Sequence, residues 1–196
     1  MDLSIRDGEN SELLRSSVYF GAVCLIFYLY APAMFDLAAR FYNGDGLTAA
    51  YAVNMLGNAC GYLSYSCLVR RGVGQRRIVL FSVVTILVTI AAMFFIKSFL
   101  LFLVVVFITA ASNGLLGALA HWSLAMLADG SPISGRAVGC AYAAALTLQY
   151  VIVHVCGSNQ PAAQAAGLII TGAAALVTAP PRALRGSSAR ARQGGR

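Results

Sequence analysis

Six long apolar stretches, separated by short polar connections, are the feature that most constrains the fold of this chain. About 20 consecutive apolar residues are enough for a helix to cross the hydrocarbon core of a bilayer. We therefore predict an all-α, polytopic integral membrane protein with about six transmembrane helices. The predicted spans are residues 17–35, 47–69, 78–96, 99–127, 137–155 and 163–179.

Composition agrees with a membrane protein. Hydrophobic residues make up 59% of the chain and charged residues only 11%, whereas an ordinary soluble domain is about 25% charged. The net charge of +7 could indicate a nucleic-acid partner. The arginines, however, gather beside the apolar stretches, where anionic lipid headgroups explain them more simply. We expect the lipid bilayer as a partner and regard nucleic acid as an unlikely one for the chain itself.

Segment 70–77 carries four arginines between the second and third predicted spans. Arginine is costly in the hydrocarbon core, so the segment belongs in water or among headgroups, and the positive-inside rule places it in the cytoplasm. With the amino terminus also inside, most basic residues fall on that side and only Arg40 and Lys97 face out. The other basic residues that we predict to be cytoplasmic are Arg6, Arg15, Arg136, Arg182, Arg185, Arg190, Arg192 and Arg196.

This topology divides the chain into three parts. Residues 1–16 are predicted to be a cytoplasmic leader, 17–180 the six-helix transmembrane domain, and 181–196 a basic cytoplasmic tail. The tail is rich in arginine, serine and glycine, and we expect it to be disordered. The predicted location is the inner (plasma) membrane, as a multi-pass protein with both termini in the cytoplasm.

Two groups of residues form motifs in a particular order. The second span holds Gly57-Asn58-Ala59-Cys60-Gly61 and leads into Arg70-Arg71-Gly72-Val73-Gly74-Gln75-Arg76-Arg77. Farther along, Ala128-Asp129 is followed by Ser134-Gly135-Arg136-Ala137-Val138-Gly139. The first pattern resembles the loop between helices 2 and 3 of the major facilitator superfamily of secondary transporters, with Arg71 standing where that family has an aspartate. The second is similar to the family's helix 4–5 junction.

The resemblance covers residues 17–180 and implies one six-helix half of a transporter. Full transporters of that family have two such halves around a central cavity. A chain of this size would then move a small solute, whose identity stays open, by alternating access as a homodimer or beside a second six-helix half. The alternative is a non-transporting sensor or anchor module of a truncated helix-turn-helix transcriptional regulator.

Polar residues at membrane depth are the candidates for a solute cavity, since each needs a partner in the protein or in a water-filled space. At ~1.5 Å of rise per residue, they lie near the middle of their spans. The candidates are Tyr28, Asn54, Asn58, Asn113 and Gln149. Hydrogen bonds that only fix helix packing are the competing interpretation. His121 and His154 are interpreted as interfacial anchors.

Small residues at four-residue spacing predict close helix packing. Gly57 and Gly61 form one such pair, Ala110 and Gly114 a second, and Gly139 with Ala143 a third. Catalytic motifs, phosphate loops and spaced metal ligands are not found in the sequence, and no span carries a mid-depth carboxylate. We therefore predict no enzymatic activity, no cofactor and no metal site.

Overall fold

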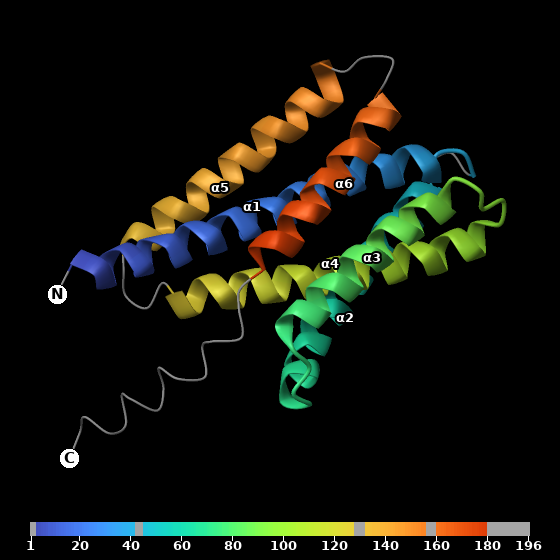
Figure 1. The fold of residues 1–196 in the computed structure, drawn as a ribbon. Helices are drawn as coiled ribbons and strands as arrows, with labels where there is room; N and C mark the ends of the chain where they lie inside the picture. The colour runs from blue at the N-terminus through green and yellow to red at the C-terminus, as the bar shows by residue number, and fades with distance from the viewer. Residues whose placement is uncertain (1–2, 42–44, 128–131, 156–159, 180–196) are drawn as a thin grey trace.

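The computed structural model describes residues 3–41, 45–127, 132–155 and 160–179. Every regular element within them is a helix and none is a strand, so the predicted all-α class is confirmed (Figure 1). The helices are α1 (Leu3–Ala38), α2 (Asp45–Arg70), α3 (Gln75–Met93), α4 (Phe99–Leu127), α5 (Pro132–Tyr150) and α6 (Gln160–Thr178), with a π-helical segment (Val151–Val155) after α5.

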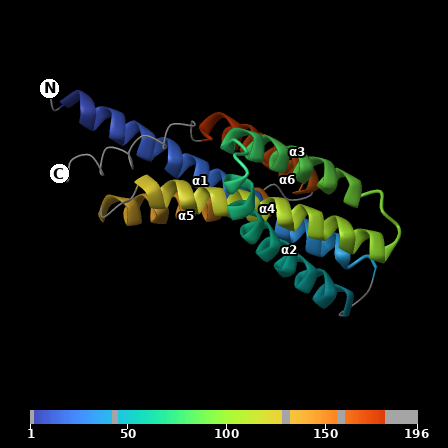
Figure 2. The same cartoon turned by 90° about the horizontal axis from the view of Figure 1, so that it is seen from below.

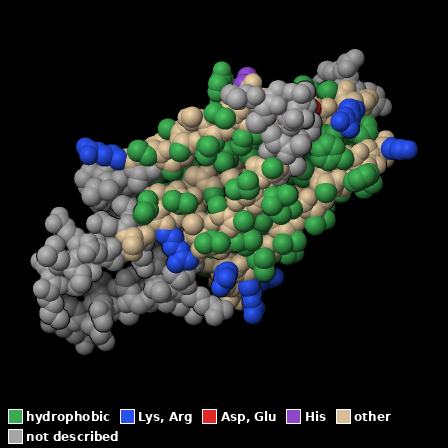
Figure 3. All heavy atoms as spheres, turned by 45° about the horizontal axis from the view of Figure 1, so that its top comes forward, with side chains coloured by type: hydrophobic (Ala, Val, Ile, Leu, Met, Phe, Trp, Pro, Cys, Tyr) green, Lys and Arg blue, Asp and Glu red, His purple; other side chains and the backbone are tan. Residues whose placement is uncertain are grey.

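Three stretches of the described helices are long and apolar enough to cross a membrane: Leu14–Ala38, Gln75–Met93 and Phe99–Ala125. Val138–His154 and Ala166–Thr178 are apolar but shorter. On the face drawn in Figure 3, Lys and Arg gather toward the two ends and the belt between them is mostly hydrophobic. This surface is compatible with a membrane protein. That the chain crosses the membrane six times remains a prediction.

Helix α1 is the centre of the bundle. It contacts α4, α5 and α6 extensively, while α3 packs against α4 and α6. Its residues Tyr19, Leu29, Tyr30 and Met34 are fully buried. Figure 1 shows α1 between α5 and α4, and in Figure 2 α6 lies beside α3, which it contacts. Although we expected the first span to begin at Ser17, α1 begins at Leu3, so most of the predicted leader continues the same helix.

Helices α2 and α4 make the most extensive contact in the molecule. Gly57 and Gly61 of α2 and Gly114 of α4 lie where the two backbones meet. A Cβ placed on Gly57 would be 2.7 Å from the Phe107 carbonyl oxygen and from the Ala110 Cβ. At Gly61 and Gly114 it would overlap the backbone of the facing helix. These glycines therefore allow the close approach that helices in lipid depend on.

The connection between α2 and α3 contains a Schellman motif. Gly72 has a φ of 75°, the left-handed conformation that glycine adopts without a Cβ clash. Its N–H donates to the Val69 carbonyl at 3.0 Å, and the Val73 N–H donates to the Leu68 carbonyl at 3.1 Å. Helix α2 thus ends in a defined turn, and Gly74 precedes the first turn of α3.

Helices α3 and α4 form an antiparallel pair rather than one continuous span. Lys97 and Ser98 lie in the turn between them, and both are exposed. Within the pair, the Thr109 hydroxyl of α4 donates to Thr89 Oγ1 of α3 at 2.8 Å. Each hydroxyl also lies within bonding distance of a carbonyl of its own helix, so both are satisfied without water.

Arg15 of α1 caps the end of α6. Its Nε donates to the Thr178 carbonyl at 3.2 Å, and its Nη2 donates to the carbonyls of Val177 and Ala179 at 3.2 and 3.0 Å. The last carbonyls of a helix lack partners within the helix and carry partial negative charge, so a guanidinium is well suited to them. The first and last helices are joined by this contact.

Candidate functional site

A pocket of about 320 Å³ lies between α1, α2, α4 and α5. Its walls are mainly apolar and aromatic, with several neutral polar side chains among them. Three of the five residues predicted to line a solute cavity, Tyr28, Asn58 and Asn113, border it. The full lining is Phe20, Val23, Cys24, Phe27, Tyr28, Met55, Asn58, Tyr62, Asn113, Gly117, Ala120, His121 and Tyr142.

Seven described residues carry a buried polar side-chain atom without a hydrogen-bond partner, and Asn113 of α4 is the one of them that lines this pocket. It is 4% exposed, and neither its amide nitrogen nor its amide oxygen has a hydrogen-bond partner among the described residues. Burying an unpaired polar group costs about 1–3 kcal/mol. Both amide atoms are buried in the structure, so a molecule in the pocket would meet them only after rotation about the χ2 torsion, which is broad for asparagine.

Asn58 of α2 lines the same pocket, and its backbone lies against Gly114, the residue after Asn113 on α4. Its Nδ2 donates to the Asn54 carbonyl at 2.9 Å, so the amide is held in one orientation. The Asn58 side-chain oxygen is then the atom available to accept a bond. Asn54 itself is buried behind Asn58 and does not border the pocket.

Tyr62 and His121 meet at one end of the pocket. The His121 Nδ1 is 2.8 Å from the Gly117 carbonyl oxygen and 2.9 Å from the Tyr62 hydroxyl. A carbonyl can only accept, so we assign a ring hydrogen to Nδ1. The Tyr62 oxygen shares the same N–H, which leaves the hydroxyl hydrogen of Tyr62 to donate elsewhere.

Tyr28 closes the pocket toward α5. Its ring meets that of Tyr142 edge to face, with the centroids 5.7 Å apart. Such an arrangement is the preferred geometry of an aromatic pair. Tyr142 is 44% exposed, so the ring that forms this side of the pocket also lies at the protein surface.

The chemistry of the pocket is neutral. None of its lining residues is Asp, Glu, Lys or Arg. It offers instead a hydroxyl donor from Tyr62, an acceptor from Asn58 and the ring of His121, set among aromatic and aliphatic surface, with the Asn113 side chain in the same lining. A site of this kind fits an uncharged molecule that both donates and accepts hydrogen bonds.

The other predicted residues lie elsewhere. Gln149 is half-buried on α5 and does not line this pocket. The motif arginines Arg70, Arg71, Arg76 and Arg77 are exposed around the Gly72 turn, with Gly74 half-buried. On α5, Gly135, Arg136 and Gly139 are exposed, and a Cβ on either glycine would meet nothing within 4 Å.

Some predictions fall outside the described residues. They are Asp129 of the helix 4–5 junction and the tail at 181–196.

Tyr62 and His121 were not predicted as cavity residues. The sequence contains a signal for both, because Asn54, Asn58 and Tyr62 recur every four residues on α2, and Asn113, Gly117 and His121 do so on α4. Residues four apart share one face of a helix. We interpreted His121 by itself, as an interfacial anchor, and so did not predict that it shares one face of α4 with Asn113.

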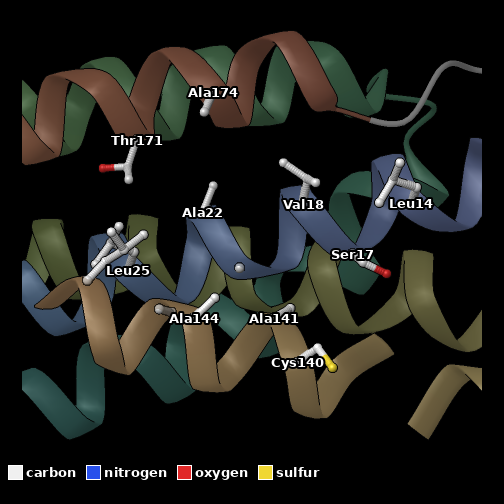
Figure 4. A pocket seen from close by; sticks show the side chains of 13 residues that line it. Leu14, Ser17, Val18, Ala22, Leu25, Cys140, Ala141, Ala144, Thr171 and Ala174 are labelled. Atoms are coloured by element: carbon white, nitrogen blue, oxygen red, sulfur yellow. The ribbon is translucent and has the colours of Figure 1, made fainter. Parts of the chain in front are cut away.

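A second and larger hollow, of about 560 Å³, lies on the other side of the α1–α5 contact (Figure 4). The two helices meet at Gly21, where a Cβ would be 3.4 Å from the Ala141 carbonyl oxygen. The hollow is bounded by α1, α5 and α6 and is almost entirely apolar. Its lining therefore differs from that of the polar pocket.

Comparisons with protein-family models, with curated proteins and with solved structures find no match to this chain.

Proposed function

We propose that this protein is a half-size membrane transporter of the major facilitator type, with six spans and both termini in the cytoplasm. It moves a small uncharged solute by alternating access, with the pocket between α1, α2, α4 and α5 as the binding site. The proposal is supported by the motif order in the sequence and by the convergence of Tyr28, Asn58 and Asn113 on one pocket.

The observation that carries the proposal is the unpaired amide of Asn113. Buried polar groups in proteins are nearly always hydrogen-bonded, and an exception calls for an explanation. If Asn113 served only packing, a partner on α1 or α2 would be expected. A solute that supplies the missing donor and acceptor accounts for both unsatisfied atoms.

The exposure of the pocket lining also favours association with a second copy or a second six-helix half. Tyr62, Tyr142 and Met55 are each 40% or more exposed although they line it, so one chain supplies a single wall. A second copy or another six-helix half facing this wall would enclose the solute, as alternating access between two halves requires.

The first test compares two neighbouring substitutions on α4. Asn113→Leu removes the unpaired amide, whereas Ser112→Ala removes a hydroxyl that bonds its own helix at Ile108. Purified protein is screened by thermal shift against a panel of uncharged solutes. Asn113→Leu should weaken binding of any hit about tenfold or more and raise the melting temperature of the empty protein.

The control Ser112→Ala should bind as the wild type does. If Asn113→Leu instead lowers the melting temperature and leaves binding unchanged, Asn113 is a packing residue. Uptake into liposomes then separates transport from sensing. A protein that binds a solute, remains a monomer in native mass spectrometry and takes nothing up would fit the sensor module rather than the half-transporter.

A further inference from the structure

The apolar hollow between α1, α5 and α6 is built by small residues on three helices. Gly21 and Ala22 of α1, Ala141 and Ala144 of α5, and Ala174 of α6 stand where larger side chains would fill the space. In Figure 4, Leu14 and Cys140 lie at one end of the hollow, and Leu25 and Thr171 lie toward the other. The hollow is therefore elongated along α1.

Among the residues that the structure describes, one end of the hollow is closed and the other is open. The π-helical segment Val151–Val155 contacts both α5 and α6, and a Cβ on Gly167 would be 3.2 Å from the Ile152 Cδ1. From this junction α5 and α6 diverge toward the start of α1 (Figure 1). The wedge between them widens in the direction of Leu14 and Cys140.

Two arginines stand at the open end. Arg15 follows Leu14 directly, and Arg136 lies one turn before Cys140 on the same face of α5. Both are exposed. The described bonds of Arg15 engage its Nε and Nη2, and no bond among the described residues engages Nη1, which carries two N–H groups.

We infer that this wedge is a binding site for an anionic phospholipid, with an acyl chain between α5 and α6 and the phosphate at Arg15 and Arg136. Basic pockets between transmembrane helices on the cytoplasmic side bind anionic headgroups. Guanidinium groups also match the geometry of phosphate oxygens. The site does not depend on the proposed transport function, because it lies on the opposite side of α5 from Tyr142.

Charge and lining favour lipid over a second copy of the chain. A partner helix would have to place acidic groups beside Arg15 and Arg136, and the chain has only seven Asp and Glu in all. Among the described helices, Asp36 and Asp45 lie at the ends of α1 and α2 away from Arg15 (Figure 1). A second copy could therefore supply acids near Arg15 only from the start of its own α1, where Asp7, Glu9 and Glu12 lie. A lipid supplies the anion and the apolar chain in one molecule.

The test uses native mass spectrometry of the full chain in detergent, titrated with dioleoylphosphatidylglycerol or dioleoylphosphatidylcholine. We expect one phosphatidylglycerol to be retained in preference to phosphatidylcholine. Ala144→Phe, which fills the wedge, should abolish retention of that lipid. The matched control Ala143→Phe, on the neighbouring exposed position outside the lining, should not.

The headgroup is tested separately. Arg136→Gln should weaken phosphatidylglycerol binding about fivefold, given the usual contribution of one basic residue near a membrane surface, and leave phosphatidylcholine unchanged. Arg77→Gln, on the α2–α3 turn, is the control. Equal retention of both lipids, or retention unaffected by Ala144→Phe, would overturn the inference. A dimer that disappears in Ala144→Phe but not in Ala143→Phe would instead assign the wedge to a second copy.

Discussion

Gly114 of α4 lies so close to the backbone of Asn58 on α2 that a side chain on this glycine would overlap the Asn58 carbonyl group. This contact fixes the spacing between the two helices that carry Asn58 and Asn113. Packing and the pocket are therefore coupled, because any widening of the α2–α4 contact also moves the polar wall.

Gly114→Ala should destabilise the protein by about 1–3 kcal/mol, the usual cost of forcing extra volume into a packed interface. The matched control is Gly139→Ala on α5, where the new Cβ meets nothing within 4 Å. Alanine favours helix over glycine by about 1 kcal/mol, so this variant should be neutral or stabilised. Thermal unfolding in detergent measures both, and equal effects at the two positions would argue against a close α2–α4 contact.

The sequence predicted six helices, and three of them contain stretches long and apolar enough to cross a membrane. It predicted the boundaries less well, since α1 extends through the polar leader and α5 begins at Pro132 rather than at residue 137. Hydropathy reports which residues tolerate lipid, whereas a helix also continues through polar residues that form good backbone bonds in water.

The pocket was predicted in part. Depth along each span identified Asn58 and Asn113 but also Gln149, because depth says nothing about which face of α5 turns inward. Asn54 and Asn58 lie on one face, yet their hydrogen bond leaves Asn54 behind the pocket wall. The hydrogen bonds from Arg15 to the end of α6 could not be predicted, because they join residues more than 160 positions apart in the sequence.

Tyr62→Phe should reduce solute binding while preserving the fold. The substitution removes the hydroxyl hydrogen that the Tyr62–His121 arrangement leaves free, and loss of one such bond typically costs about 0.5–1.5 kcal/mol. We expect a severalfold rise in the dissociation constant. Tyr51→Phe, on the same helix but outside the pocket, is the control, and isothermal titration with a solute found by the screen is the measurement. A hydroxyl with no role in binding would give identical constants for the two variants.

Arg15→Ala should lower stability by about 1–2 kcal/mol, because three carbonyls at the end of α6 lose a charged donor. Arg15→Lys keeps the charge but not the forked donor geometry, so it should recover only part of the loss. Arg40→Ala, an exposed arginine just beyond the end of α1, should have little effect. The comparison is made by thermal unfolding, and a full recovery by lysine would show that charge alone stabilises the end of α6.

The six-span topology predicts that the α2–α3 and α3–α4 turns lie on opposite sides of the membrane. In a background with the native cysteines replaced, a cysteine introduced by Gly74→Cys should be protected from an impermeant maleimide added to intact cells. One introduced by Ser98→Cys, in the exposed turn after α3, should be labelled. The physical reason is the arginine excess of segment 70–77 against the single Lys97 on the other side. Labelling of both cysteines from outside would mean that α3 does not cross the membrane, and the half-transporter topology would fail with it.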